Sequence, residues 1–226
     1  MTAPAPQLLI FDLDGTLLDT AADIAAAVNR VRRHYALEPL PPPTIAGYIG
    51  DGVRALISRV LPGREADLDD AVRLQKAFYL ERLHDQTRPY PGVVDGLAQL
   101  HAAGHCLAVA TNKATEATEA LLRHFGVRVF FAHVLGGGSV PELKPHPQML
   151  CEIMQRAGID AGRTWMIGDN RTDLEAARRA GVRSVFVTYG IGEDGGEPAT
   201  LRCGSFAELS AAFLPAGGPS TATRAG

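Results

Sequence analysis

The 226-residue sequence alternates short apolar runs with longer amphipathic segments, and this alternation constrains its fold more than any other feature. A continuous apolar run at Leu8–Phe11 lies between Pro6 and Asp12, as is typical of a strand buried on both faces. Beyond Pro91, similar runs recur at 107–110, 132–135, 165–167 and 184–188, separated by helical patterns that end near a glycine. Such alternation predicts βαβ crossovers. We therefore expect an α/β fold with a Rossmann-like parallel sheet and helices on both of its faces.

One stretch of the chain departs from this alternation. Between the first predicted strand and Pro89 only helical patterns occur, for example Ile24, Val28 and Val31 at three- and four-residue steps. We therefore expect a helical cap over residues 19–88, inserted into an α/β core made of residues 1–18 and 89–214. The last residues, 215–226, are small and polar, and we expect them to form a mobile tail.

Composition excludes several classes of function. The chain carries 22 Lys+Arg against 25 Asp+Glu and has no long basic run, so a nucleic-acid partner is not expected. No apolar stretch approaches the roughly 20 residues that span a bilayer, and the first residues lack the pattern of a signal peptide. Three cysteines without Cys-x-x-Cys spacing fit reduced thiols. We expect a cytoplasmic protein without a membrane partner; its composition leaves open whether it is a monomer or a homodimer.

Two carboxylates follow the first predicted strand. Asp12 and Asp14 lie two residues apart where the apolar run ends, and Gly15 permits a sharp turn just beyond them. Carboxylates crowded in this way repel each other, so they need a cation, a shared proton or both. An isolated pair of this kind is also consistent with a solvated turn or a helix cap.

Polar residues also follow the other predicted strands. Thr111 and Asn112 come after the run at 107–110, Asp169 follows the run at 165–167, and Asp173 lies one helical turn later. Lys144 precedes a predicted helix and adds positive charge. Because ligands bind in the crevice beyond the carboxyl ends of parallel strands, we expect these side chains to converge with Asp12 and Asp14 on one site.

In this order, these residues resemble the four motifs of the haloacid dehalogenase superfamily, and the match spans nearly the whole chain. Within the superfamily, the Thr111-Asn112-Lys113 sequence and the Lys144-Pro145-His146-Pro147 sequence resemble the phosphoglycolate phosphatase group. Asn170 stands where that group usually has serine, and it retains a polar side chain.

The resemblance implies catalytic roles. Asp12 would attack phosphorus and form an aspartyl phosphate, and Asp14 would serve as acid and then as base. Thr111 and Lys144 would stabilise the phosphoryl group. The implied cofactor is Mg²⁺, held by the carboxylates of Asp12 and Asp169 and the main-chain carbonyl of Asp14, with Asp173 steadying the shell.

The resemblance also implies substrate contacts from Thr16, from the main chain of Asn112 and from a cap loop. In that loop, Gly52 would let the backbone approach the ligand, and Arg54 would pair with a substrate carboxylate. The same loop is equally consistent with an ordinary turn between two helices that carries a solvated arginine.

The function implied is Mg²⁺-dependent hydrolysis of a small phosphorylated metabolite, with 2-phosphoglycolate as the expected substrate. A sugar phosphomutase similar to β-phosphoglucomutase and a pyrophosphatase are alternatives on the same core. A binding module without catalytic activity is a third, which the filled catalytic positions disfavour.

Overall fold

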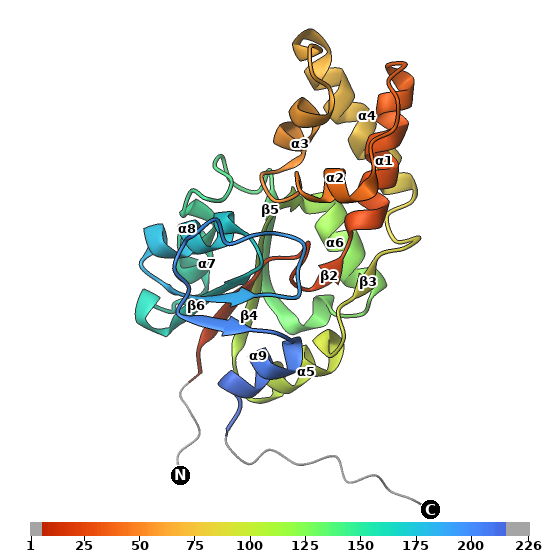
Figure 1. Cartoon of the computed structure of the whole chain (residues 1–226). Helices are drawn as coiled ribbons and strands as arrows, with labels where there is room; N and C mark the ends of the chain where they lie inside the picture. The colour runs from red at the N-terminus through yellow and green to blue at the C-terminus, as the bar shows by residue number, and fades with distance from the viewer. Residues whose placement is uncertain (1–5, 216–226) are drawn as a thin grey trace, which may run out of the picture.

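The computed structural model describes residues 6–215, and its centre is a six-stranded parallel sheet. The strands lie in the order β5-β4-β1-β6-β7-β8, so the first strand of the chain is central (Figure 1). The predicted α/β fold with a parallel sheet is confirmed. The strand bounds are β1 Leu8–Phe11, β4 Cys106–Ala114, β5 Phe131–Gly137, β6 Thr164–Gly168, β7 Arg183–Val187 and β8 Leu201–Cys203.

Two apolar layers bury the two faces of this sheet. In β1, Leu9 and Phe11 face one layer and Leu8 and Ile10 face the other, because successive side chains of a strand point to opposite faces. One layer packs against helices α5, α6 and α9, and the other against α7 and α8. These helices span α5 Val93–Ala102, α6 Thr115–His124, α7 Gln148–Ala157, α8 Arg171–Ala180 and α9 Phe206–Phe213.

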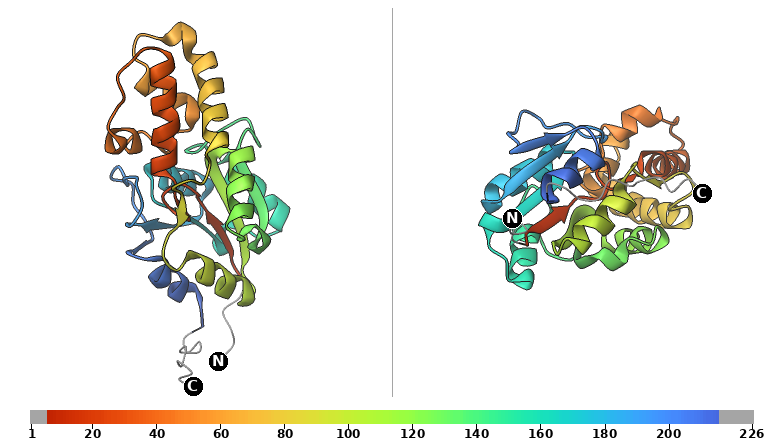
Figure 2. Two further views of the ribbon diagram at one scale, coloured as in Figure 1. Left: turned by 90° about the vertical axis from the view of Figure 1, so that its right-hand side faces the viewer. Right: turned by 90° about the horizontal axis from the view of Figure 1, so that it is seen from below.

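Helices α1 to α4, which we call the cap, lie at the opposite end of the molecule from α5 and α9 (Figures 1 and 2). They span α1 Ala21–His34, α2 Pro42–Ala46, α3 Val53–Val60 and α4 Leu68–Glu81. The chain enters and leaves the cap through two short antiparallel strands, β2 Leu18–Asp19 and β3 Arg88–Pro89.

Beside this ribbon, a buried carboxylate links the segment that enters the cap to the segment that returns from it. Asp23, in the first turn of α1, accepts hydrogen bonds from the amides of Gln86 and Thr87 and from the Thr87 hydroxyl, at 2.8–3.1 Å. The return segment is therefore fixed to the start of the cap by a polar contact that excludes water, since Thr87 is fully buried.

The structure corrects the sequence analysis in several elements. The strand predicted at 107–110 continues to Ala114, so Thr111 and Asn112 lie within β4, where its pairing with β5 is irregular. The two ribbon strands, β8 and α9 were not predicted. The predicted tail lies outside the described residues, apart from Pro215.

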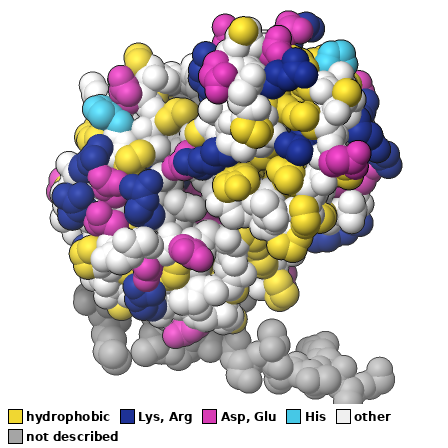
Figure 3. Space-filling model, turned by 45° about the horizontal axis from the view of Figure 1, so that its top comes forward, with side chains coloured by type: hydrophobic (Ala, Val, Ile, Leu, Met, Phe, Trp, Pro, Cys, Tyr) yellow, Lys and Arg dark blue, Asp and Glu magenta, His cyan; other side chains and the backbone are white. Residues whose placement is uncertain are grey.

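On the face in Figure 3, basic and acidic side chains are interspersed over both the cap and the core. Within residues 6–215, none of the helices is both long and apolar enough to cross a membrane.

Candidate active site

The loop after β1 places the first carboxylate at the edge of the sheet. The Asp12 amide donates to the carbonyl of Ile167 at 2.9 Å, which continues the pairing of β1 with β6. The chain then turns sharply at Gly15, whose φ of +80° is accessible to few residues with a side chain. A Cβ at this position would lie 2.0 Å from Asp169 Oδ2, so glycine is required here for two reasons.

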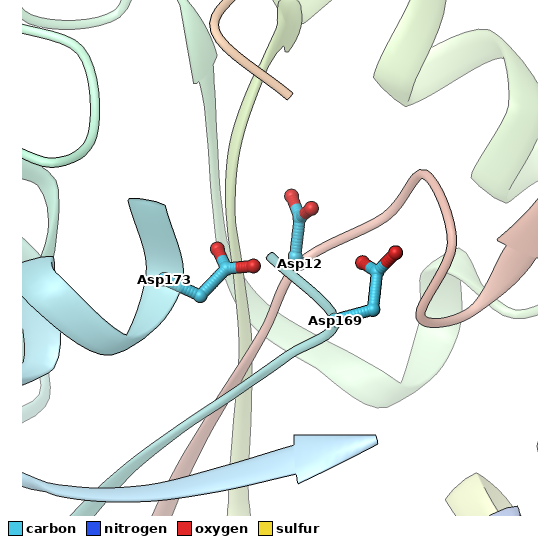
Figure 4. A group of neighbouring side chains, drawn as sticks. All are labelled: Asp12, Asp169 and Asp173. Atoms are coloured by element: carbon cyan, nitrogen blue, oxygen red, sulfur yellow. The ribbon is translucent and has the colours of Figure 1, made fainter. Parts of the chain in front are cut away.

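Three buried carboxylates meet at this edge. Asp12 follows β1, Asp169 follows β6 and Asp173 lies in the first turn of α8, and each offers an oxygen within 4.8 Å of the others (Figure 4). The oxygens face one shared space although their residues are up to 161 positions apart in the sequence. Parallel strands ending at a common edge produce this convergence.

Asp169 is held by three donors. Its Oδ1 accepts from the Thr16 hydroxyl at 3.0 Å, and its Oδ2 accepts from the amides of Ile191 and Gly192 at 3.0 and 2.8 Å. Burial and the nearby charge of Asp12 nevertheless raise the pKa of Asp169 to about 7. These hydrogen bonds lower the pKa of Asp169, but burial and the charge of Asp12 outweigh them.

Lys144 compensates part of this charge. Its ammonium lies 2.5 Å from Asp173 Oδ1 and 3.0 Å from Asp12 Oδ1, and its side chain is almost fully buried. Burial lowers the pKa of Lys144, but the charges of Asp12 and Asp173 outweigh this and leave it above its ordinary value. Asp173 also completes a capping box with Asn170 at the start of α8, so asparagine serves there as an effective helix cap.

The donor set fits a divalent cation. Among the described residues, Asp12 Oδ1 is a buried oxygen that accepts no well-aligned hydrogen bond, although the Lys144 ammonium lies 3.0 Å away. Asp12, Asp169 and Asp173 offer only carboxylate oxygens, the ligands that hard cations such as Mg²⁺ prefer. A bound cation would offset the burial and the charge of Asp12, which together raise the pKa of Asp169.

Asp14 belongs to a second charged group. Its carboxylate accepts from Lys113 Nζ at 2.9 and 3.2 Å and from the Thr20 hydroxyl at 2.7 Å. The Lys113 side chain is 6% exposed, and its ammonium lies 4.3 Å from the centre of the Tyr79 ring. Asp14 is therefore paired with a lysine of β4 and with a threonine at the start of the cap.

Asn112 links three segments around the site. Its amide group donates to the carbonyls of Gly50 and Lys144, both at 2.8 Å, and its Oδ1 accepts from the Lys144 amide at 2.8 Å. The side chain thus fixes the Lys144 loop to β4 and joins both to the cap loop. Gly52 follows in that cap loop with a φ of +88°, and it lines the cavity described below.

A cavity opens between the cap and the core. Asp12, Asp14, Thr111, Asn112 and Gly52 all line it. Asp169, Asp173 and Lys144 lie next to Asp12, through the contacts given above. The structure thus brings together most of the residues that the sequence singled out.

Two predicted substrate contacts are placed elsewhere. Thr16 is fully buried and its hydroxyl is bound to Asp169, so it positions a carboxylate instead of facing the cavity. Arg54 does not line the cavity; its exposed side chain pairs with Asp69. It is the second residue of α3, and its side chain points toward solvent.

Several residues of the site were missed by the sequence analysis. Lys113 belongs to the Thr111-Asn112-Lys113 motif, which assigns it no role, and no motif marks Tyr79 within the expected cap. The amides of Ile191 and Gly192 come from a loop without a recognisable motif. The position of Lys113 directly after Asn112 was the one available signal, because it places a cation at the same strand end.

Fold and site together define an α/β protein with a cluster of aspartates, balanced in part by lysine, at the carboxyl edge of a parallel sheet. The family model described as haloacid dehalogenase-like hydrolase matches residues 9–187. This chain belongs to that family.

Individual proteins resemble this chain over most of its length. It is 40% identical over 193 residues to a phosphoglycolate phosphatase of Neisseria meningitidis, covering 83% of this chain and 82% of that protein. It is 38% identical over 209 residues to a phosphoglycolate phosphatase of Chromobacterium violaceum, covering 90% and 94%. A crystal structure described as a predicted phosphoglycolate phosphatase from Haemophilus somnus superposes with a TM-score of 0.89 at 29% identity, covering 94% and 100%.

Proposed function

We propose that this hydrolase releases phosphate from a small phosphate monoester, 2-phosphoglycolate, with Mg²⁺ as cofactor and an aspartyl phosphate as intermediate. That the chain is a hydrolase follows from its family. The observation that carries the proposal is Asp12, a buried carboxylate that lines the cavity and whose Oδ1 lies 3.0 Å from the Lys144 ammonium. The phosphoglycolate phosphatases among its relatives supply the choice of substrate.

In the first step, an oxygen of Asp12 forms a bond to phosphorus as the bond from phosphorus to the ester oxygen breaks. Asp14 gives a proton to the departing alkoxide. In the second step, water attacks the phosphorus of the aspartyl phosphate and Asp14 takes a proton from that water. The Asp12 carboxylate is restored and inorganic phosphate leaves.

The surrounding residues stabilise the charge of the phosphoryl group. Lys144 is already 3.0 Å from Asp12 Oδ1, so its ammonium lies beside the position where the phosphoryl group would be transferred. Thr111 lines the same cavity and offers a hydroxyl. Asp12, Asp169 and Asp173, with the main-chain carbonyl of Asp14, would hold Mg²⁺, which when bound neutralises charge on the phosphoryl oxygens.

The cap is part of the proposal. We place its boundaries at residues 19 and 88, where the β2 and β3 ribbon connects it to the core. Movement about this ribbon would admit substrate and then exclude water from the phosphoryl group. A cytoplasmic location is consistent with the free thiols of Cys106, Cys151 and Cys203.

The test is initial-rate phosphate release from 2-phosphoglycolate, sugar phosphates, nucleoside monophosphates and pyrophosphate, with Mg²⁺ and after chelation. Asp12→Asn is the active-site variant. Asp70→Asn makes the same chemical change on the exposed surface of α4 and is the matched control. We expect a preference for 2-phosphoglycolate that is abolished by chelation and by Asp12→Asn but unaffected by Asp70→Asn.

Other outcomes would contradict parts of the proposal. Broad activity that Asp12→Asn abolishes would preserve the mechanism and refute the substrate. Activity that requires a bisphosphate primer would indicate a phosphomutase, and Asp12→Asn with full activity would refute the nucleophile.

A further inference from the structure

The cavity is mostly apolar away from the phosphoryl site. Ile24, Ile49, Val53 and Leu56 contribute much of its wall, together with other apolar side chains of α4 and α6. Apolar walls provide no partner for a charged group on the substrate, so any recognition of a second anion depends on the few polar side chains in the cavity.

Two buried polar side chains among the residues that line the cavity, Lys113 and Tyr79, lie next to each other. Lys113 Nζ has three N–H donors, and its contacts with the two oxygens of Asp14 leave donor capacity free. The Tyr79 hydroxyl is buried and, within the part of the chain that the structure describes, has no hydrogen-bond partner. Burial raises the pKa of Tyr79 to about 12, so the group is a neutral donor at physiological pH.

A buried hydroxyl without a partner costs free energy in the ligand-free protein, and a ligand that supplies an acceptor recovers it. The Tyr79 ring lies 4.3 Å from the Lys113 ammonium, so an oxygen anion beside Lys113 is also near the tyrosine side chain. Both side chains come from elements that position them firmly: Lys113 from β4 and Tyr79 from the buried face of α4.

The positions of Lys113 and Tyr79 relative to Asp14 determine where on the substrate a second anionic group must lie. Asp14 is the residue proposed to protonate the leaving oxygen, and Lys113 is in direct contact with it. An anionic group one carbon away from the ester oxygen would therefore fall beside Lys113. In 2-phosphoglycolate, one methylene group separates the ester oxygen from the carboxylate.

We propose that Lys113 and Tyr79 form a subsite for a carboxylate on the leaving group, and that they select phosphate esters with a carboxylate one carbon from the ester oxygen. This inference rests on the proposed function. Lys76 also lines the cavity, but it is exposed to solvent, so it is not part of the subsite.

The test compares kcat/KM for 2-phosphoglycolate with kcat/KM for its neutral amide, 2-phosphooxyacetamide. Wild type should prefer the carboxylate by about 10²-fold or more, because a site built to pair with a charged group rejects an analogue without it. Lys113→Met should reduce this ratio to near one. If Lys113→Met shifts the position of Asp14, kcat/KM changes by the same factor for both substrates, so this effect cancels in the ratio.

Two further variants keep the test interpretable. Tyr79→Phe removes only the hydroxyl, so it tests the subsite even if Lys113→Met does not fold; it should lower the ratio about tenfold. Lys76→Met should leave the ratio unchanged.

A wild-type ratio of the two kcat/KM values near one overturns the inference. So does a ratio that is unchanged in both Lys113→Met and Tyr79→Phe, or a ratio that falls to near one only in Lys76→Met. Wild type that hydrolyses neither ester refutes the proposed function and this inference with it. Hydrolysis of both esters at equal kcat/KM refutes the inference alone.

Discussion

Replacing Asp23 by alanine should destabilise the junction between cap and core. Asp23 accepts from the amide and the hydroxyl of Thr87, both at 2.8 Å, and from the amide of Gln86. Alanine leaves the two donors of the fully buried Thr87 without an acceptor, whereas the exposed Gln86 amide regains water. Each buried unsatisfied donor costs about 1–3 kcal/mol, and the Thr87 hydroxyl can rotate toward another acceptor, so we expect a loss of about 2–4 kcal/mol.

Urea unfolding measures this loss. With a slope of about 2–3 kcal/mol per molar urea, the midpoint should fall by about 1 M. Trp165 is the only tryptophan and lies in β6, so its fluorescence reports the core while far-UV circular dichroism reports the whole chain. A circular dichroism transition that precedes the fluorescence transition would show that the cap unfolds first.

The control is Asp85→Ala in the same segment. Asp85 is exposed and pairs with Arg82 three residues away, a contact worth less than about 0.5 kcal/mol. If Asp23→Ala and Asp85→Ala shift the midpoint equally, the reasoning about buried donors at the junction is refuted.

Three further predictions concern the site. Gly15→Ala should abolish phosphate release, since a Cβ would lie 2.0 Å from Asp169 Oδ2; Gly158→Ala, at a φ of +64° with no neighbour within 4 Å, is the control and should retain kcat. Because the pKa of Asp169 is raised to about 7, the folded metal-free protein holds a proton that the unfolded chain releases near pH 4. Its stability should therefore fall as pH rises from about 4 to 7, and the increase in Tm on adding Mg²⁺ should be larger at pH 8 than at pH 6; equal increases would contradict this. Arg54→Ala should leave KM for 2-phosphoglycolate unchanged and stability within about 0.5 kcal/mol, because its exposed pair with Asp69 is weak; a large rise in KM would restore its predicted substrate contact.

Local sequence patterns predicted most of the core but not its edges. The apolar run of β1 and the helices that end near glycines gave clear signals, since burial on two faces requires continuous apolar residues. β8 has two exposed residues of three, and β2 and β3 have two residues each, so no periodic pattern marks them. Strands this short exist only because a neighbouring strand pairs with them.

The sequence by itself determined which residue types meet at the carboxyl edge of the sheet. Asp12, Asp169 and Asp173 follow strands or begin a helix that follows one, and parallel topology alone brings such positions together. Family motifs then assigned them a chemistry. These inferences depend on chain order and strand direction, both of which can be read from the sequence.

Only the tertiary structure decided which partner each polar side chain takes. Thr16 turns to Asp169, Arg54 turns outward to Asp69, and Lys113 pairs with Asp14 beside Tyr79. Each choice depends on the direction of a side chain within a helix or turn and on which other segment packs against it. Because charge and hydrogen bonding act over a few ångströms, contacts between distant segments are fixed only once the cap and the core are packed together.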